Sequence, residues 1–112
     1  MGRIEGKTAT GKLILNLSVL FRKIAASEMA EAHAWYELQS PGLGVEFSST
    51  ISKCLDRISQ NPDLYPLVTD DIRQAILNRF PFCIYYKIRD QKVIVLAIFH
   101  SARDPKNWQA RN

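Results

Sequence analysis

The feature that most constrains this chain is a pair of long apolar strands near its C-terminus, in the segment RFPFCIYYKIRDQKVIVLAIFHSARDPKNW (residues 79–108). Residues 82–87 and 93–99 are rich in the aromatic and β-branched side chains that are enriched in strands. The polar residues between them, 89–91, are few enough for the loop of a β-hairpin. Because the second strand is apolar on both faces, we expect it to be central in a sheet and covered on both sides.

Strict alternation along the two strands assigns their side chains to opposite faces of the sheet. In the first strand, we expect one face to carry Phe82, Ile84 and Tyr86 and the other to carry Cys83 and Tyr85. In the second strand, we expect one face to carry Val93, Val95, Ala97 and Phe99 and the other to carry Ile94, Leu96 and Ile98. Chemically versatile residues follow directly after the second strand: His100, Arg103, Asp104 and Trp108. We therefore expect function at that end of the sheet.

The preceding residues predict one strand and two helices. Residues 16–23 alternate weakly and suit a strand, and Ser27 is a candidate N-cap for a helix over residues 27–39, with Glu28 in its first turn. On this helix, Trp35 and Tyr36 should pack against the sheet. A Ser-Pro-Gly turn ends it, and a second helix with one apolar stripe spans about residues 43–60. The short connection predicts an antiparallel helical hairpin.

Residues 63–71 are expected to form a loop, and residues 72–79 a third strand that Pro81 separates from the fourth. The element order is therefore β-α-α-β-β-β. We predict an α+β fold in which the helical hairpin packs on one face of a small, mainly antiparallel four-stranded sheet, with the first strand beside the last. The opposite face should carry Tyr85, Lys87 and Arg89, and we consider Arg73 and Arg79 for the same face.

The length of 112 residues fits one domain, which we place at residues 13–112. Residues 1–12 are polar and lack periodicity, so we interpret them as a flexible tail or a remnant of cloning. No apolar run approaches the roughly 20 residues that span a bilayer, and no secretory signal is indicated, so we expect a cytoplasmic protein without a membrane partner. Cys54 and Cys83 lack metal-ligand spacing, which predicts buried free thiols, no metal and no cofactor.

Charge is distributed unevenly along the chain. Residues 72–112 carry eight basic and two acidic side chains, whereas residues 13–71 carry four basic and eight acidic ones. A basic sheet half favours a polyanion or an acidic protein as partner, although a solvated surface gives the same pattern.

Four segments in this order, AEAHAWYELQSPGLGVEF, NPDLYP, IRQAILNRFPFCIYYKI and VIVLAIFHSARDPKNWQAR, resemble the RelE/ParE superfamily of toxins from type II toxin–antitoxin systems. The resemblance covers roughly residues 15–111 and is strongest to the ParE-like, plasmid stabilisation branch. It implies a small toxin whose partner is a cognate antitoxin protein. In this superfamily the antitoxin wraps around the toxin, often with a helix in a groove and a strand at the sheet edge.

The superfamily contains two activities. RelE-like members cleave mRNA, typically on the ribosome, whereas ParE-like members poison DNA gyrase and are not nucleases. Metal-free RNA cleavage needs a base, an acid and cations that stabilise the pentacoordinate phosphate. The candidates here are Arg79, His100 and Arg103, with Tyr85 and Lys87 as further options.

Two departures from the RelE-type pattern favour the ParE-like activity. The resemblance places an arginine of RelE-type nucleases at Cys83, and a thiol cannot stabilise a phosphorane as a guanidinium does. The RelE-type C-terminal tyrosine matches a position near Trp108, which has no transferable proton. We therefore expect a gyrase-binding toxin rather than an enzyme, with a ribosome-dependent endoribonuclease as the alternative and an inactive, antitoxin-sequestering module as the third interpretation.

The resemblance and the charge distribution together suggest a set of residues that contact the target or the antitoxin: Arg73, Tyr85, Lys87, Arg89, Arg103 and Trp108. Structural roles compete for several of the positions near the chain's end. His100 could simply hydrogen-bond a loop carbonyl, Arg103 and Asp104 could form a local turn pair, and Trp108 could cover the core. The sequence leaves the oligomeric state open.

Overall fold

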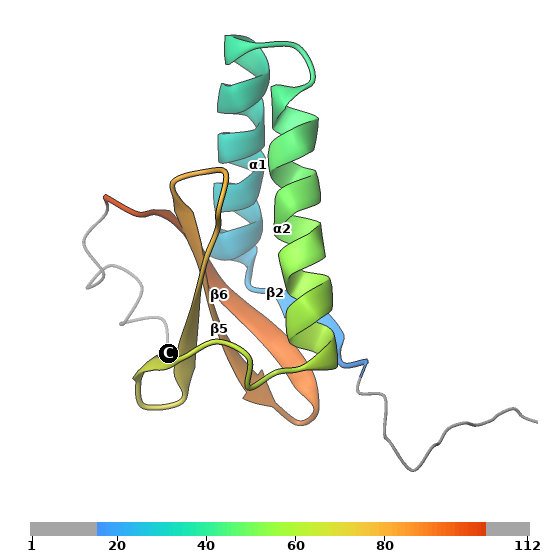
Figure 1. Cartoon of the computed structure of the whole chain (residues 1–112), viewed down its shortest axis with the longest axis vertical. Coiled ribbons are helices and arrows are strands. Elements are labelled where there is room, and N and C mark those ends of the chain that lie inside the picture. The colour runs from blue at the N-terminus through green and yellow to red at the C-terminus, as the bar shows by residue number, and fades with distance from the viewer. Residues whose placement is uncertain (1–15, 103–112) are drawn as a thin grey trace, which may run out of the picture.

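The computed structural model describes residues 16–102 (Figure 1). Arg103, Asp104, Trp108 and the tail at residues 1–12 therefore lie outside the described residues. The elements, in chain order, are β2 (Ser18–Phe21), α1 (Lys23–Gln39), α2 (Leu43–Gln60), β3 (Leu67–Thr69), β4 (Ile72–Ile76), β5 (Phe82–Arg89) and β6 (Lys92–His100). No helix in this part of the chain is long and apolar enough to cross a membrane.

The strands form one mixed sheet in the order β2-β6-β5-β4-β3. β2 runs parallel to β6, and the other neighbours are antiparallel. The predicted α+β architecture is confirmed, including the pairing of the first strand with the last. The sheet has five strands rather than four, because β3 forms within the segment predicted to be a loop. β3 has only three residues and pairs with β4 in an irregular register, so it leaves no alternating pattern in the sequence.

The turn between β5 and β6 has two residues, Asp90 and Gln91, with positive φ angles of 54° and 59°. This geometry is that of a type I′ turn, whose twist matches the twist of the two strands that it joins. The predicted hairpin is therefore confirmed, with Arg89 as the last residue of β5 rather than part of the loop.

A β-bulge divides β6 into two parts. Tyr85 is opposite Ala97 and Tyr86 is opposite Val95, so Leu96 is an extra residue on β6. Val93, Val95 and Ile98 therefore face the helices, whereas Leu96, Ala97 and Phe99 belong to the apolar cluster on the opposite face. The prediction of strict alternation along β6 is wrong for this reason, and the alternation predicted for β5 is confirmed.

The helical hairpin covers one face of the sheet and buries the main core. Four aromatic side chains in mutual contact pack between the hairpin and the start of β5: Tyr36, Phe47, Phe80 and Phe82. Their ring centroids lie 4.9 to 5.3 Å apart in the close pairs, a range typical of favourable edge-to-face contacts. Figure 1 shows the hairpin extending beyond the end of the sheet.

Helix α1 begins at Lys23, four residues before the predicted start at Ser27. Arg22 occupies the N-cap position without a side-chain cap, and Ala25 in the first turn is fully buried. Glu28 does not cap the helix either. Its Oε1 atom accepts a hydrogen bond from the Ile98 backbone N–H of β6 at 3.1 Å.

The start of α2 is fixed by its partner helix. The Glu37 carboxylate of α1 accepts hydrogen bonds from the backbone N–H groups of Gly42 at 2.8 Å and Gly44 at 3.0 Å. A Cβ atom at residue 44 would lie 2.5 Å from the His33 carbonyl oxygen, so only glycine permits this close approach of the helices. His33 Nδ1 also lies 2.7 Å from the Ser48 hydroxyl, which adds a second link across the hairpin.

Candidate functional site

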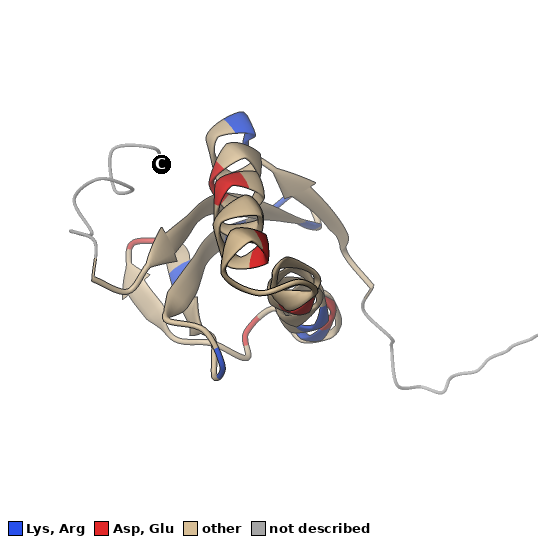
Figure 2. Ribbon diagram, turned by 90° about the horizontal axis from the view of Figure 1, so that it is seen from above, with Lys and Arg blue, Asp and Glu red and all other residues tan. Residues whose placement is uncertain are grey.

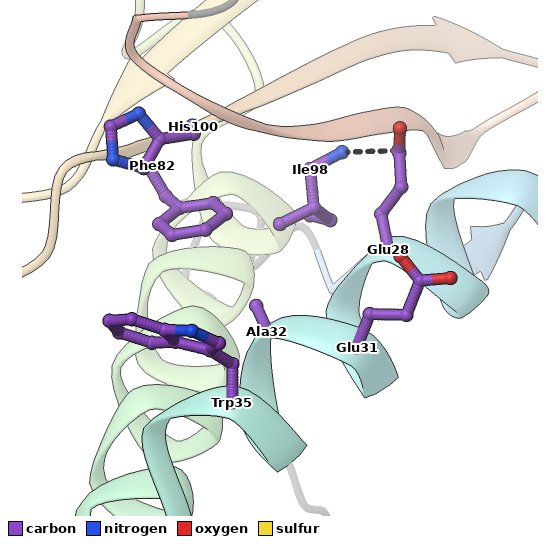
Figure 3. Close-up of a pocket in the computed structure, with 7 residues that line it drawn as sticks. All are labelled: Glu28, Glu31, Ala32, Trp35, Phe82, Ile98 and His100. Carbon is purple, nitrogen blue, oxygen red and sulfur yellow. Dashed lines mark hydrogen bonds between the residues drawn. The ribbon is translucent and has the colours of Figure 1, made fainter. Parts of the chain in front are cut away.

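The first candidate site is a groove between α1 and the end of β6, which we call the α1–β6 groove. It consists of two adjoining hollows of about 290 and 340 Å³. Both hollows share the residues Ala32, Trp35, Phe82 and His100. Figure 3 shows the Trp35 indole and the Phe82 ring on opposite sides of the space, with His100 beyond Phe82. The walls are therefore mainly aromatic, which suits an apolar side chain of a partner.

One end of the groove is acidic and lies against an open strand edge. Glu28 and Glu31 line this end (Figure 3). The pairing of β2 with β6 stops at Phe21 and Val95, where the Arg22 N–H donates to the Val95 carbonyl at 3.0 Å. Beyond that point Ile98 donates its N–H to the Glu28 side chain instead of to a neighbouring strand. This part of β6 is a sheet edge that a side chain of α1 covers.

Trp35 was expected to pack α1 onto the sheet, and this prediction is wrong. Its side chain is 57% exposed, whereas Tyr36 is buried as predicted. The Trp35 ring meets Tyr36 edge-on at 5.1 Å and otherwise faces the groove. Tryptophan is one of the residue types enriched among the residues that dominate protein interfaces, so the exposed Trp35 is a candidate contact for a partner. The helical spacing of Ala25, Ala32 and Tyr36 was the available signal, because it places Tyr36 on the buried stripe and Trp35 beside it.

His100 is held at the end of β6 by local contacts. Its ring meets Phe82 edge-on at 5.3 Å, and its Nδ1 atom accepts a hydrogen bond from the Ala102 N–H at 3.1 Å. The bond to a loop carbonyl considered for His100 is thus replaced by one from a backbone N–H, and the same ring lines the groove. Both roles that the sequence left open are compatible with this position.

The second candidate site lies on the other helix and contains Arg79. This cavity of about 530 Å³, which we call the α2–β4 pocket, is lined by Thr50, Lys53, Arg57, Tyr65, Ile76, Leu77, Asn78 and Arg79. Arg79 is fixed by an ion pair with Glu46 at 2.7 Å and by a position 5.4 Å from the Phe80 ring centroid. Lys53 and Arg57 were not among the predicted site residues. Their spacing of one helical turn on α2 could have indicated that the two cationic side chains lie on the same side of the helix.

Two of the three leading candidates for RNA cleavage, Arg79 and His100, lie within the described chain and line different cavities. Arg79 lines the α2–β4 pocket together with residues of α2, and His100 lines the α1–β6 groove together with residues of α1. None of these cavities formed by residues 16–102 is lined by both side chains. Arg103, the third candidate, lies outside the described residues.

The residues predicted for the face opposite the helices are largely engaged in packing. Tyr85 and Lys87 are only 7% and 5% exposed, and the Tyr85 hydroxyl accepts a hydrogen bond from Gln74 at 2.8 Å. Arg73 lies on the helix side, where it pairs with Asp63 at 3.2 Å and donates to the Tyr65 carbonyl at 2.7 Å. Arg89 is exposed and pairs with Asp71 at 3.4 Å. The binding roles of these four residues stay predictions.

Both cysteines are buried free thiols, as predicted, with Cys54 on α2 and Cys83 on β5. Burial raises the pKa of the Cys83 thiol, and this keeps it in its neutral, unreactive form. Within residues 16–102, no group of three or more His, Cys, Asp or Glu side chains is arranged to hold a metal ion.

Comparison with known proteins places this fold in a family. A family model described as "ParE toxin of type II toxin-antitoxin system, parDE" matches residues 19–105. The chain belongs to the ParE toxin family. The resemblance seen in the sequence is thereby confirmed at its ParE-like branch, and the protein is a toxin of a type II toxin–antitoxin system.

Solved structures that match this ParE-family chain include one from a study described as "Chromosomal ParDE TA system from P. aeruginosa". The two chains superpose with a TM-score of 0.66 at 17% sequence identity, and the match covers 76% of this chain and 96% of the other. At this identity the likeness shows the fold. A search among curated proteins finds no match.

Proposed function

We propose that this ParE-family protein inhibits growth by binding DNA gyrase, and that a cognate antitoxin neutralises it by covering the α1–β6 groove. The observation that carries the choice of target is the separation of Arg79 and His100 into two cavities. A metal-free ribonuclease must bring its base, acid and cations within hydrogen-bond reach of one phosphodiester. An arrangement that divides these groups favours a toxin that acts by binding.

The position that matches the RelE-type arginine supports the same choice. Cys83 is 3% exposed and packs within the apolar cluster on the sheet face opposite the helices. A neutral thiol in this environment supplies neither charge nor a strong hydrogen bond to a phosphorane. Replacing an active-site cation by a packing residue removes a group that the cleavage mechanism needs.

The antitoxin part of the proposal rests on the groove. The exposed Trp35 and the neighbouring Phe82 provide an aromatic surface of the kind that a helix of a partner can cover. The adjoining edge of β6 at Ile98 is held only by a side chain, so a strand of the partner could replace Glu28 there. The geometry thus fits the antitoxin binding mode that the superfamily implies.

Gyrase as target would place the action of this toxin in the cytoplasm, with residues 13–112 as the toxin domain. Its system would stabilise the replicon that encodes it, because cells that lose the antitoxin gene are left with the toxin. The proposal needs neither a metal nor a cofactor.

Two parallel reactions with purified components test the target. In one, the toxin is incubated with DNA gyrase, ATP and relaxed plasmid; in the other, with ribosomes programmed with mRNA. We expect loss of supercoiling, restored by the antitoxin, and intact mRNA. The double variant Arg79→Ala/His100→Ala serves as the control and should still inhibit gyrase. Cleaved mRNA together with normal supercoiling would overturn the proposal and select the ribosome-dependent nuclease, and no effect in either reaction would indicate an inactive binding module.

A further inference from the structure

The α1–β6 groove has two ends of different chemistry, joined by an apolar floor. At one end the Trp35 indole and the Phe82 ring lie on opposite sides of the space (Figure 3). The other end is lined by Glu28 and Glu31. Ala32 lies between the two ends, on the helix that carries both glutamates. The groove therefore presents aromatic faces and carboxylates to one elongated space.

The spacing of the lining residues along α1 sets the length of this space. Glu28, Glu31 and Trp35 follow one another at intervals of three and four residues, so they share one side of the helix. The seven residues from Glu28 to Trp35 correspond to about 10 Å along the helix axis. A ligand that contacts both ends of the groove must therefore be a chain rather than a compact group.

The negative charge at the acidic end is not balanced by a neighbouring cation. No lysine or arginine among the described residues lines either hollow of the groove. The Glu31 side chain is exposed and has no hydrogen-bond or ion-pair partner within residues 16–102. The Glu28 carboxylate is held at this end by the Ile98 N–H at 3.1 Å. Figure 2 shows the acidic positions along α1, whose one lysine is its first residue, Lys23.

The aromatic end of the groove suits a cation as well as an apolar group. The face of an aromatic ring carries negative potential, so it attracts an ammonium group within about 6 Å of the ring centroid. Both Trp35 and Phe82 line the two hollows, and the Trp35 side chain is 57% exposed. An ammonium group between these rings is attracted by both of them, while the methylene groups beside it pack on the apolar ring surface.

We propose that the α1–β6 groove binds an aliphatic polyamine, with one ammonium group between the two aromatic rings and a second beside the two glutamates. The methylene chain that joins the ammonium groups lies over Ala32, so each part of the ligand meets a surface of matching chemistry. Binding of the polyamine does not depend on the target of the toxin. Only one consequence, competition with the antitoxin for the same walls, rests on the proposed function.

A polyamine fits these observations better than other charged ligands do. A lysine or arginine side chain of a partner carries one positive charge, so it occupies one end of the groove and leaves the other end without a cation. A metal ion lacks ligands here, since within residues 16–102 no three His, Cys, Asp or Glu side chains are arranged to hold one. The net charge of +4 disfavours unspecific attraction of a polycation to the rest of the chain.

The test is an NMR titration of the isotope-labelled full chain with the triamine spermidine. We expect a dissociation constant of about 1 mM or lower, with the largest shifts at the Trp35 indole N–H and at the amides of Ala32 and Ile98. The amides of Lys53 and Arg57, which line the other pocket, should not shift. Two comparison ligands, butylamine with its single ammonium group and the neutral chain triethylene glycol, should each bind about fivefold more weakly or less.

Two variants remove one end of the site each. Glu31→Gln should weaken spermidine binding about threefold or more, because an exposed ion pair is lost. Trp35→Leu should weaken it by a similar factor, because the attraction between cation and ring is lost while an apolar contact is kept. Asp56→Asn is the matched control, since it removes an exposed carboxylate of α2 that does not line the groove, and it should leave binding unchanged. The amide spectrum of each variant reports whether it is folded.

Three results would each overturn the inference. The first is equal weakening of spermidine binding by Asp56→Asn and Glu31→Gln, and the second is a set of shifts spread over both helices instead of the groove. The third is binding of acetyl-lysine amide as tight as that of spermidine, which would assign the groove to a single cationic side chain of a partner. None of these measurements uses gyrase or the antitoxin, so a failure of this inference is distinguishable from a failure of the proposed function.

Discussion

The α1–β6 groove and the α2–β4 pocket lie against the two helices of one hairpin, yet they differ in charge and in shape. The groove is aromatic with an acidic end, and a side chain of α1 occupies the strand edge beside it. The pocket is cationic, and the strand edge beside it is open. An acidic segment would be repelled at Glu28 and Glu31 and attracted at Lys53 and Arg57. Because the two regions differ in charge, one partner that contacts both of them could bind in only one orientation.

The largest effect on this comparison should come from disrupting the aromatic cluster behind the groove. Phe47 is fully buried and contacts Tyr36, Phe80 and Phe82, and two of these, Tyr36 and Phe82, line the groove. Phe47→Ala should lower the free energy of unfolding by about 3–5 kcal/mol, because it leaves a cavity in the aromatic cluster. Urea unfolding measures the change. Val45→Ala, at an exposed position of the same helix, should change it by less than about 0.5 kcal/mol.

An effect of intermediate size is expected on antitoxin binding, which we assign to the groove and not to the pocket. Trp35→Ala should weaken antitoxin binding about tenfold or more, because an exposed aromatic anchor is lost, while the urea midpoint stays nearly constant. Calorimetric titration with the antitoxin provides the measurement. Leu38→Ala is the matched control, since Leu38 is 84% exposed on α1 but does not line the groove. Equal losses for both variants would show that the groove is not the site.

The smallest effect is expected on the free energy of unfolding, through a pH-dependent contact in the helical hairpin against which both regions lie. Hydrogen bonds from the backbone N–H of Gly42 and then of Gly44, with the charge of His33, hold the pKa of Glu37 below its usual value. A lowered pKa in the folded state contributes stability above the unfolded pKa, and this contribution is lost as the pH falls through the folded pKa. Glu37→Gln should therefore reduce the fall in stability between about pH 6 and pH 3. Urea titrations at both pH values check this, with Glu31→Gln as control; identical acid sensitivity of Glu37→Gln and the parent chain would contradict it.

Much of the fold was predictable because it depends on local pattern and on burial. The apolar stripe of α2 and the two strands of the β5–β6 hairpin are encoded in consecutive residues, and they gave the element order and the sheet neighbours. The start of α1 was not predictable from Ser27 and Glu28, since Glu28 bonds a strand 70 positions away in the sequence. Capping rules consider only residues that are close in the sequence, whereas the Glu28 carboxylate accepts a hydrogen bond from the backbone N–H of the distant residue Ile98.

The candidate site was less predictable than the fold. His100 and Arg79 were singled out by residue type, but their separation into two cavities depends on how the hairpin crosses the sheet. Trp35 was assigned to the core because aromatic residues are usually buried, and only the rotation of α1 about its axis exposes it. The spacing of Lys53 and Arg57 puts them on one side of α2, but only the structure shows that they line a cavity with residues 76–79.

The extra residue at Leu96 has a consequence for comparing this chain with its relatives. A strand is normally aligned without gaps, but β6 contains a position that has no partner on β5. A relative without the bulge would match this chain on both sides of Leu96 only if the alignment places a one-residue gap inside the strand. Without that gap, every residue of one half would be assigned to the wrong face of the sheet. Homologous positions in β6 should therefore be matched separately on each side of the bulge.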